Sequence, residues 1–270
     1  MINKVLQDKL RTQFNPDGSE LRSYQLYLLQ MLKDFDKICK EIGVKYWLAS
    51  GTLLGAMRHG GFIPWDDDID VEMMKEDYNK LIKFFKETDK YVIQTHENDH
   101  YYFQTFAKFR DKNSELEEKT RGQQHYKYKG VFIDIFPMNL TYRPASKKLN
   151  ALIRIFAKPL RSNRKLPTFI IKLSKFLINS VFKVIPYVEK HYATRIDLEF
   201  GHDYGSFFCN NKRDLTKDKL YPLQIASFEN QNFPIPNNAS QYLTTIFGDW
   251  EKLPSLQHIH QHLVNIKYNK

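Results

Sequence analysis

Four aspartates occupy five neighbouring positions of this chain, within the run Trp-Asp-Asp-Asp-Ile-Asp-Val over residues 65–71. Carboxylates this close repel one another, and strands disfavour Asp, so folding stability alone does not select such a run. A divalent cation would remove this objection by supplying positive charge to the cluster. The run therefore predicts a metal-binding segment at the entry to a strand.

We predict that strand over residues 68–73. On it, Asp68 and Asp70 share one face, while Ile69 and Val71 share the other and point toward a core. Two carboxylates that leave coordination positions open for phosphate oxygens are what a Mg²⁺-dependent transferase needs.

Asp66 shares the parity of the pair but precedes the strand. A solvated acidic turn is the alternative interpretation. A calcium loop of the EF-hand type does not fit, because its required Gly and Glu positions, counted from Asp66, hold Val71 and Asp77.

Two further motifs support a site for phosphate and metal. Ser50, Gly51 and Thr52 follow an expected strand over residues 44–49 and open a short helix, an arrangement that points backbone N–H groups at an anion. Asp134 stands alone in the apolar strand expected over residues 130–136, where a carboxylate is costly unless it is paired or metal-bound. An ion pair with an Arg is the other explanation for Asp134.

Three cationic residues could help to hold phosphate. Arg58 and His59 end the short helix, where cations are also favoured for their own sake, and the two interpretations are about equal. Lys108 lies with Arg110 on an expected strand and could neutralise negative charge, although a solvated strand edge explains it equally well.

The order of elements predicts an α+β fold with a mixed sheet flanked by helices. The spacing predicts a long amphipathic helix from Leu21 to Ile42, ended by Gly43. Further expected elements are a helix over 75–86 and strands over 91–95 and 101–109. We divide the chain into a catalytic core at 15–143, a basic helical insert at 144–200, and a C-terminal segment at 201–270 that packs back on the core.

The composition excludes several classes of protein. Hydrophobic residues make up 42% and charged residues 27% of the 270 residues, which excludes a wholly disordered chain. Two cysteines, Cys39 and Cys209, are too few for a disulfide framework or a zinc cluster and fit a reducing compartment. Residues 1–14 contain no apolar segment typical of a secretory signal, so we expect a cytoplasmic protein.

The formal net charge of +10 is compatible with nucleic acid, an anionic membrane or a phosphorylated substrate, and does not choose among them. The stretch from Phe169 to Ile185 is strongly apolar but is interrupted by lysines, so it is too short an apolar run to span a bilayer. It either packs on the core, which is slightly favoured, or lies in a membrane interface on the inner face.

These motifs together resemble the LicD family of phosphocholine transferases, which is related to the fukutin and fukutin-related proteins. The resemblance lies in residues 46–70, which read YWLASGTLLGAMRHGGFIPWDDDID, and residues 130–137, which read GVFIDIFP. It continues more weakly in the Phe-Gly-Asp-Trp run at residues 247–250. The segment that follows, residues 253–258, departs from the family pattern, which puts an acceptor role for the tail in doubt.

The resemblance implies a nucleotidyltransferase-like fold and a CDP-linked donor. It implies that Asp68 and Asp70 are the metal pair, with Asp66 completing the run, and that Asp134 is the third ligand and general base. The segment Ser50–Thr52 takes the place of the donor-phosphate turn. The implied cofactor is Mg²⁺ or Mn²⁺, and the implied acceptor is a hydroxyl of a cell-surface glycan, such as lipopolysaccharide or teichoic acid, or of its lipid-linked precursor.

If the transferred group carries a quaternary ammonium, an aromatic cage is expected. The available rings are Trp47, Trp65, Tyr101 and Tyr102, although core packing explains each of them singly. The alternate histidines at 258, 260 and 262 resemble a run of metal ligands but fit a loop or helix surface better.

Three other activities compete with transfer of phosphocholine. The group moved could be phosphoethanolamine or a polyol phosphate. The enzyme could instead add a nucleotide to a small molecule or an RNA. A non-catalytic protein that binds metal or nucleic acid, using its basic surface, is the alternative from another class, and the Tyr126–Lys129 run hints at nucleic acid. The three carboxylates would be superfluous there, so no nucleic-acid partner is expected.

Overall fold

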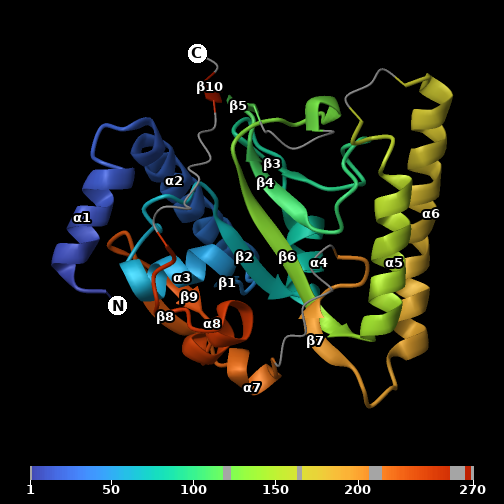
Figure 1. Ribbon diagram of the computed structural model, residues 1–270. Coiled ribbons are helices and arrows are strands. Elements are labelled where there is room, and N and C mark those ends of the chain that lie inside the picture. Colours follow the sequence, from blue (N-terminus) through green and yellow to red (C-terminus); the bar gives the residue numbers. More distant parts are fainter. Residues whose placement is uncertain (1, 118–122, 163–165, 207–214, 256–264, 269–270) are drawn as a thin grey trace. The chain divides into compact units, whose positions relative to one another are not determined.

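The computed structural model describes residues 2–117, 123–162, 166–206, 215–255 and 265–268 (Figure 1). The chain forms two compact units. The first unit contains residues up to Phe85, the short segment 132–135 and the C-terminal part from Leu215. The second contains Lys86–Val131, Phe136–Asp214 and the last strand.

The first unit is built from helices around a small sheet and a hairpin. Strand β2 lies between β1 and the first residues of β6, while β8 and β9 pair with each other. The elements are α1 (Lys4–Phe14), α2 (Glu20–Ile42), β1 (Trp47–Leu48), α3 (Ser50–His59), β2 (Asp70–Met74), α4 (Lys75–Phe84), β6 (Phe132–Thr141, shared with the second unit), α7 (Lys217–Leu220), β8 (Gln224–Phe228), β9 (Gln231–Ile235) and α8 (Ala239–Phe247).

The second unit combines antiparallel strands with a pair of long helices. Strand β3 pairs with β4, and the end of β6 pairs with β7. Strand β5 pairs with the last strand, β10. The elements are β3 (Tyr91–Gln94), β4 (Ala107–Asp111), β5 (Ser114–Glu117), the 3₁₀ turn η1 (Gln123–His125), α5 (Arg143–Phe156), α6 (Thr168–Tyr192), β7 (Glu199–His202) and β10 (Asn265–Tyr268).

Helix α2 forms as the sequence predicts. Ser19 caps its first turn, because the Ser19 Oγ accepts a hydrogen bond from the Arg22 N–H at 3.2 Å. Gly43 ends the helix with φ +74°, a left-handed conformation that favours glycine, and its N–H donates to the Cys39 carbonyl at 2.9 Å. The apolar stripe between these caps is buried and forms the core against the strands.

The strands of the first unit are shorter than expected at the site. We expected one strand over 68–73, but β2 begins at Asp70, so Asp68 lies in the preceding loop. The reason is that the neighbouring strand β1 ends at Leu48, where the chain turns into α3. Leu48 pairs with Val71, so no residue of β1 remains to pair with Asp68. The expected alternation is confirmed for the aliphatic side chains, because Ile69 and Val71 are fully buried.

The second unit has its own core, formed where α5 and α6 lie side by side (Figure 1) and pack on an aromatic segment. That segment was expected to be a strand over 101–109, but β4 begins only at Ala107. A turn around Asp99 intervenes, in which the Tyr102 N–H donates to the Asp99 carbonyl and the Tyr101 N–H to its carboxylate. The Tyr102 and Phe103 rings are thereby turned into the helical core.

The α+β class, with a sheet core flanked by helices, is confirmed. Helix α1 was not expected from the weak apolar pattern of residues 1–14, in which only Leu10 is buried; the Asn3 side chain caps this helix by accepting from the Leu6 N–H at 2.8 Å. Among the residues that the structure describes, no helix is both long and apolar enough to cross a membrane.

Candidate active site

The acidic run lies on a loop between α3 and β2. The loop starts with a tight turn, in which the Asp66 N–H donates to the Ile63 carbonyl at 2.9 Å. Pro64 occupies the second position of this turn, where its fixed φ is favourable. Pro64 is buried, whereas Asp66 and Asp67 are half-buried and Asp68 is exposed, so the turn delivers the carboxylates to the surface.

Asp66 and Asp68 form a hydrogen-bonded pair of carboxyl groups. Burial, followed by the negative charges of Asp68 and Asp67, holds the pKa of the Asp66 carboxyl well above its usual value. The positive charge of a bound cation would offset this repulsion between the carboxyl groups. The donor set of the loop therefore fits a hard divalent cation, which prefers oxygen ligands.

Gly51, in the first turn of α3, leaves the space that Asp66 occupies. A Cβ atom built on Gly51 would lie 3.0 Å from the Asp66 Oδ2. That separation is tighter than ordinary van der Waals contact, so any larger residue at position 51 pushes against the carboxyl. The first turn of α3 and the Asp66 side chain are therefore in direct contact.

The first turn of α3 is also tied to the start of β2. The Asp70 N–H donates to the Thr52 hydroxyl at 2.9 Å, and the Ala49 N–H donates to the Asp70 carbonyl at 3.0 Å. These two bonds hold Asp70 beside the helix N-terminus. The Thr52 side chain is almost fully buried, so its hydroxyl oxygen serves the protein backbone.

The N-terminus of α3 has the form of an anion site. Its N-cap residue is Ala49, whose side chain makes no capping hydrogen bond, and the first amides of any helix have no acceptor within it. Ser50 adopts φ +46°, an unusual conformation for a residue other than glycine. Such backbone strain is often held in place where it serves a function.

Asp134 lies on the strand next to the acidic loop. Its N–H donates to the Ile69 carbonyl at 3.0 Å, so Asp134 stands beside the peptide that joins Asp68 to Asp70. Ile133 and Ile135 are fully buried, and the Asp134 side chain is half-buried, as the expected alternation requires. Among the described residues, no three His, Cys, Asp or Glu side chains are gathered closely enough to hold a metal ion.

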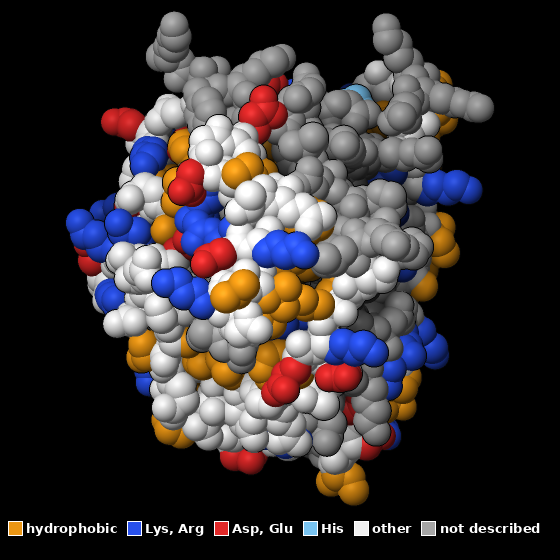
Figure 2. All heavy atoms as spheres, turned by 60° about the vertical axis from the view of Figure 1, so that its left-hand side comes forward, with side chains coloured by type: hydrophobic (Ala, Val, Ile, Leu, Met, Phe, Trp, Pro, Cys, Tyr) orange, Lys and Arg blue, Asp and Glu red, His pale blue; other side chains and the backbone are white. Residues whose placement is uncertain are grey.

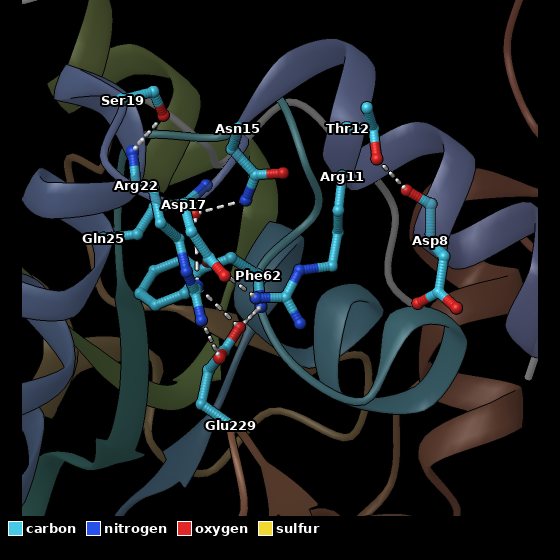
Figure 3. A network of polar contacts seen from close by, with 10 residues as sticks. All are labelled: Asp8, Arg11, Thr12, Asn15, Asp17, Ser19, Arg22, Gln25, Phe62 and Glu229. Atoms are coloured by element: carbon cyan, nitrogen blue, oxygen red, sulfur yellow. Dashed lines mark hydrogen bonds and ion pairs between the residues drawn. The ribbon is translucent and has the colours of Figure 1, made fainter.

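The ion pair between Arg22 and Glu229 holds the start of the loop at Phe62 (Figure 3). The Arg22 guanidinium on α2 donates twice to the Glu229 carboxylate, at 3.1 and 2.6 Å, and both side chains are largely buried. The same carboxylate accepts from the Phe62 N–H at 3.1 Å, and the Glu229 N–H donates to the Gly60 carbonyl. Gly61 allows this approach, because a Cβ there would lie only 2.3 Å from the Glu229 Oε1.

Gln25 continues this network to the acidic run. Its Nε2 donates to the Asp66 carbonyl at 2.8 Å, while its Oε1 accepts from the Asn15 amide at 2.6 Å. The sequence analysis missed both Gln25 and Glu229. A polar residue on the apolar stripe of α2, between Leu21 and Leu28, was the available signal for Gln25; the sequence offers none for Glu229, which lies about two hundred residues from Arg22.

Arg58 and His59 are used by the protein itself. The buried Arg58 guanidinium donates to the Trp250 and Lys252 carbonyls at 2.9 and 3.2 Å, and its Nε donates to the His59 Nε2. The His59 Nδ1 lies 2.7 Å from the Gln7 Oε1. Burial and the Arg58 charge lower the pKa of His59 to about 3, so the ring is neutral. These contacts favour the structural interpretation of both residues.

The candidate cage rings have separate partners. Trp47 is fully buried and donates to the Glu72 carboxylate at 3.1 Å, which also accepts from the Tyr242 hydroxyl at 2.8 Å. Trp65 packs edge-on against Phe14, with the ring centroids 5.1 Å apart. The buried Tyr102 hydroxyl donates to a backbone carbonyl. Core packing accounts for Trp47 and Tyr102.

The last candidate cation of the site, Lys108, belongs to the second unit. Lys108 is buried on β4 of the second unit, with its Nζ 5.8 Å from the centroid of the Phe106 ring. Arg110, its neighbour on the strand, donates to the Gln94 side chain and to the Gly130 carbonyl. The alternate histidines at 258, 260 and 262 lie outside the described residues.

Comparison with known proteins agrees with the resemblance. Residues 43–151 match the model of the LicD/FKTN/FKRP nucleotidyltransferase domain. The lipopolysaccharide cholinephosphotransferase LicD of Haemophilus influenzae is 28% identical over 249 residues, which cover 87% of this chain and 92% of that protein. All four aspartates expected at the site, Ser50–Thr52 and the Arg58–His59 pair fall within the matched domain.

Two other relatives match over shorter stretches. The human ribitol 5-phosphate transferase FKRP is 52% identical over 40 residues, 15% of this chain and 8% of that protein. The mouse ribitol-5-phosphate transferase FKTN is 39% identical over 72 residues, 26% of this chain and 15% of that protein. All three relatives carry names that describe the transfer of a substituted phosphate group.

Proposed function

We propose that this chain, whose residues 43–151 match the LicD/FKTN/FKRP nucleotidyltransferase domain and which is 28% identical to a LicD protein over most of its length, transfers a substituted phosphate group, of the phosphocholine type, from a CDP-linked donor to a hydroxyl. The acceptor would be a cell-surface glycan or its lipid-linked precursor. The observation that carries the proposal is the Asp66–Asp68 carboxyl pair against Gly51 at the N-terminus of α3, with Asp134 on the adjoining strand.

The carboxylates of the acidic loop are suited to hold Mg²⁺ or Mn²⁺. Asp66, Asp68 and Asp70 would hold the ion together with Asp134. Such an ion would neutralise the diphosphate of the donor and the charge that develops on the phosphoryl oxygens in the transition state.

The N-terminus of α3 would hold the donor phosphate. The backbone N–H groups of Ser50, Gly51 and Thr52 would donate to its oxygens, and the helix dipole favours negative charge at that end. These N–H groups are held in place before the CDP-linked substrate binds, because the hydrogen bonds of Ala49 and Thr52 with Asp70 fix the turn. A prearranged set of donors stabilises charge without reorganisation during the reaction.

Asp134 would act as the general base. Its carboxylate would accept the proton of the acceptor hydroxyl, the hydroxyl oxygen would bond to the phosphorus that bears the choline-like group, and the bond from that phosphorus to the bridging oxygen would break. Cytidine monophosphate would then leave with that oxygen. Such positioned proton transfer typically contributes about 10²–10⁴-fold to a rate.

A panel of donors tests this function. Purified protein would be incubated with CDP-choline, CDP-ethanolamine and a CDP-linked polyol, each with Mg²⁺, with Mn²⁺ and with a chelator, and the release of cytidine monophosphate would be measured. We expect release that needs the cation and one preferred donor. Label from the cytidine appearing on the acceptor would instead establish a nucleotidyltransferase, and absence of release with every donor would contradict the proposal.

A further inference from the structure

Helix α6 is apolar on two opposite faces. Its inner residues Ile178, Val181, Phe182 and Ile185 are buried in the core of the second unit. The opposite face carries large apolar side chains at helical spacing that are between 46% and 75% exposed: Phe169, Leu173, Phe176, Val184 and Tyr187. A surface helix ordinarily presents polar residues on the face away from its core, so this outer face is suited to a second, apolar environment.

The segment that carries this face is also unusually basic. Residues 143–192 contain twelve Lys or Arg and a single acidic residue, Glu189. The net positive charge of this segment is therefore larger than that of the whole chain. Of the ten Lys and Arg of this segment that the structure describes, eight are exposed: Lys147, Lys148, Arg154, Lys158, Arg161, Lys172, Lys183 and Lys190. By contrast, residues 1–85 contain twelve basic and thirteen acidic residues.

Three of these lysines border the outer apolar face directly. Lys172, Lys183 and Lys190 recur at helical spacing, about one sixth of a turn from the line through Phe169, Phe176 and Tyr187, at about 100° per residue. Figure 2 shows a different kind of surface on the side it brings forward, where acidic and basic side chains are interspersed. The outer face of α6 therefore combines exposed apolar side chains with positive charges and no negative charge among these residues.

We propose that the outer face of α6 lies on an anionic lipid bilayer, with its aromatic side chains in the headgroup boundary and its lysines on lipid phosphates. A helix of this kind binds in the plane of the interface, through apolar burial together with attraction to anionic lipids. The charge selects this occupant over a second copy of the chain, since two faces of the same positive sign repel. The inference does not depend on which donor the enzyme uses.

Sedimentation with vesicles tests the proposal. The full chain would be mixed with vesicles of phosphatidylcholine alone or of phosphatidylcholine with phosphatidylglycerol, at low and high salt and without any donor. We expect binding to the anionic vesicles at low salt that weakens at least tenfold at high salt and on the neutral vesicles. Protein that stays in the supernatant under every condition would overturn the proposal.

Two sets of variants locate the contact. Replacing Phe169, Phe176 and Tyr187 by Ser should weaken binding at least tenfold, whereas replacing the exposed Leu26, Phe84 and Ile225 by Ser should not. Equal losses in both sets would overturn the proposal. A wild-type dimer that the first set converts to monomers would also overturn it, because the face would then be a subunit interface.

The charge is tested in the same assay. Replacing Lys172, Lys183 and Lys190 by Glu should abolish binding, and these exposed residues can change without disturbing the core. Replacing the exposed Lys9, Lys33 and Lys37 by Glu changes the net charge equally and serves as the control, which should retain most of the binding. Equal losses would show that only net charge matters and would overturn the assignment to α6. Release of cytidine monophosphate with a water-soluble acceptor should be unchanged in all four variants.

Discussion

The side-chain amide of Gln25 donates a hydrogen bond to the backbone carbonyl of Asp66 at 2.8 Å. Gln25 is fully buried on α2, a helix that otherwise serves the core. The bond therefore connects α2 to the backbone of the first aspartate of the acidic run. A position that packing would fill with an aliphatic residue is instead occupied by a group that orients the site.

Gln25→Leu keeps the volume but removes this bond and leaves the Asp66 carbonyl without its donor. We expect a loss of roughly tenfold in kcat/KM, which corresponds to about 1.4 kcal/mol and is within the range for one hydrogen bond. Steady-state kinetics with the preferred donor would measure it. Gln30→Leu removes an exposed bond to Asp34 on the same helix and should leave kcat/KM unchanged; equal effects would show that Gln25 has no special relation to the site.

The pair formed by Arg22 and Glu229 should dominate the stability of the loop. Glu229→Leu leaves a largely buried guanidinium without its carboxylate, so we expect a loss of about 3–5 kcal/mol in the free energy of unfolding. The double variant Arg22→Met with Glu229→Leu should recover much of this loss, because no charge is left buried alone. Urea unfolding would measure both, with the exposed pair of Lys37 and Glu41 as the control.

The sequence was sufficient for features that depend on local spacing. Helix α2, with its caps at Ser19 and Gly43, and the burial of Ile69 and Val71 follow from periodicity and turn chemistry alone. The start of β2 could not be predicted, because it depends on where the neighbouring strand β1 ends. The hydrogen-bond partners of the site residues could not be predicted either, because the contacts of Arg58 with Trp250 and Lys252 join residues far apart in the chain.

Gly51→Ala tests the contact between α3 and the acidic run. The added Cβ would lie 3.0 Å from the Asp66 Oδ2 and should displace that carboxyl, which lowers the affinity for Mg²⁺ with little change in the fold. Activity titrated against Mg²⁺ would measure the shift, which we expect to be severalfold. Gly201→Ala adds a Cβ with nothing within 4 Å and is the control. An unchanged Mg²⁺ requirement would separate Asp66 from the metal.

His59 should make the fold sensitive to acid. Its pKa is lowered to about 3 in the folded chain by burial and by Arg58, whereas the unfolded value is 6.5. The unfolded state therefore binds more protons between these values, and stability falls as the pH drops from about 6.5 toward 3, by at most about 1.4 kcal/mol per pH unit. His59→Gln should flatten this dependence in urea unfolding measured across that range, and an identical slope in both proteins would contradict it.

Asp134→Asn separates proton transfer from binding. The amide keeps the size of the carboxyl but cannot accept the acceptor's proton, so single-turnover transfer should fall by about 10²–10⁴-fold while donor binding is largely retained. Asp70→Ala, which removes a proposed metal ligand, should instead abolish both metal-dependent donor binding and transfer. Asp89→Asn alters an exposed carboxylate and should match the wild type. A single-turnover rate in Asp134→Asn equal to that of the wild type would remove Asp134 from the chemical step and leave it the role of a ligand or a structural charge.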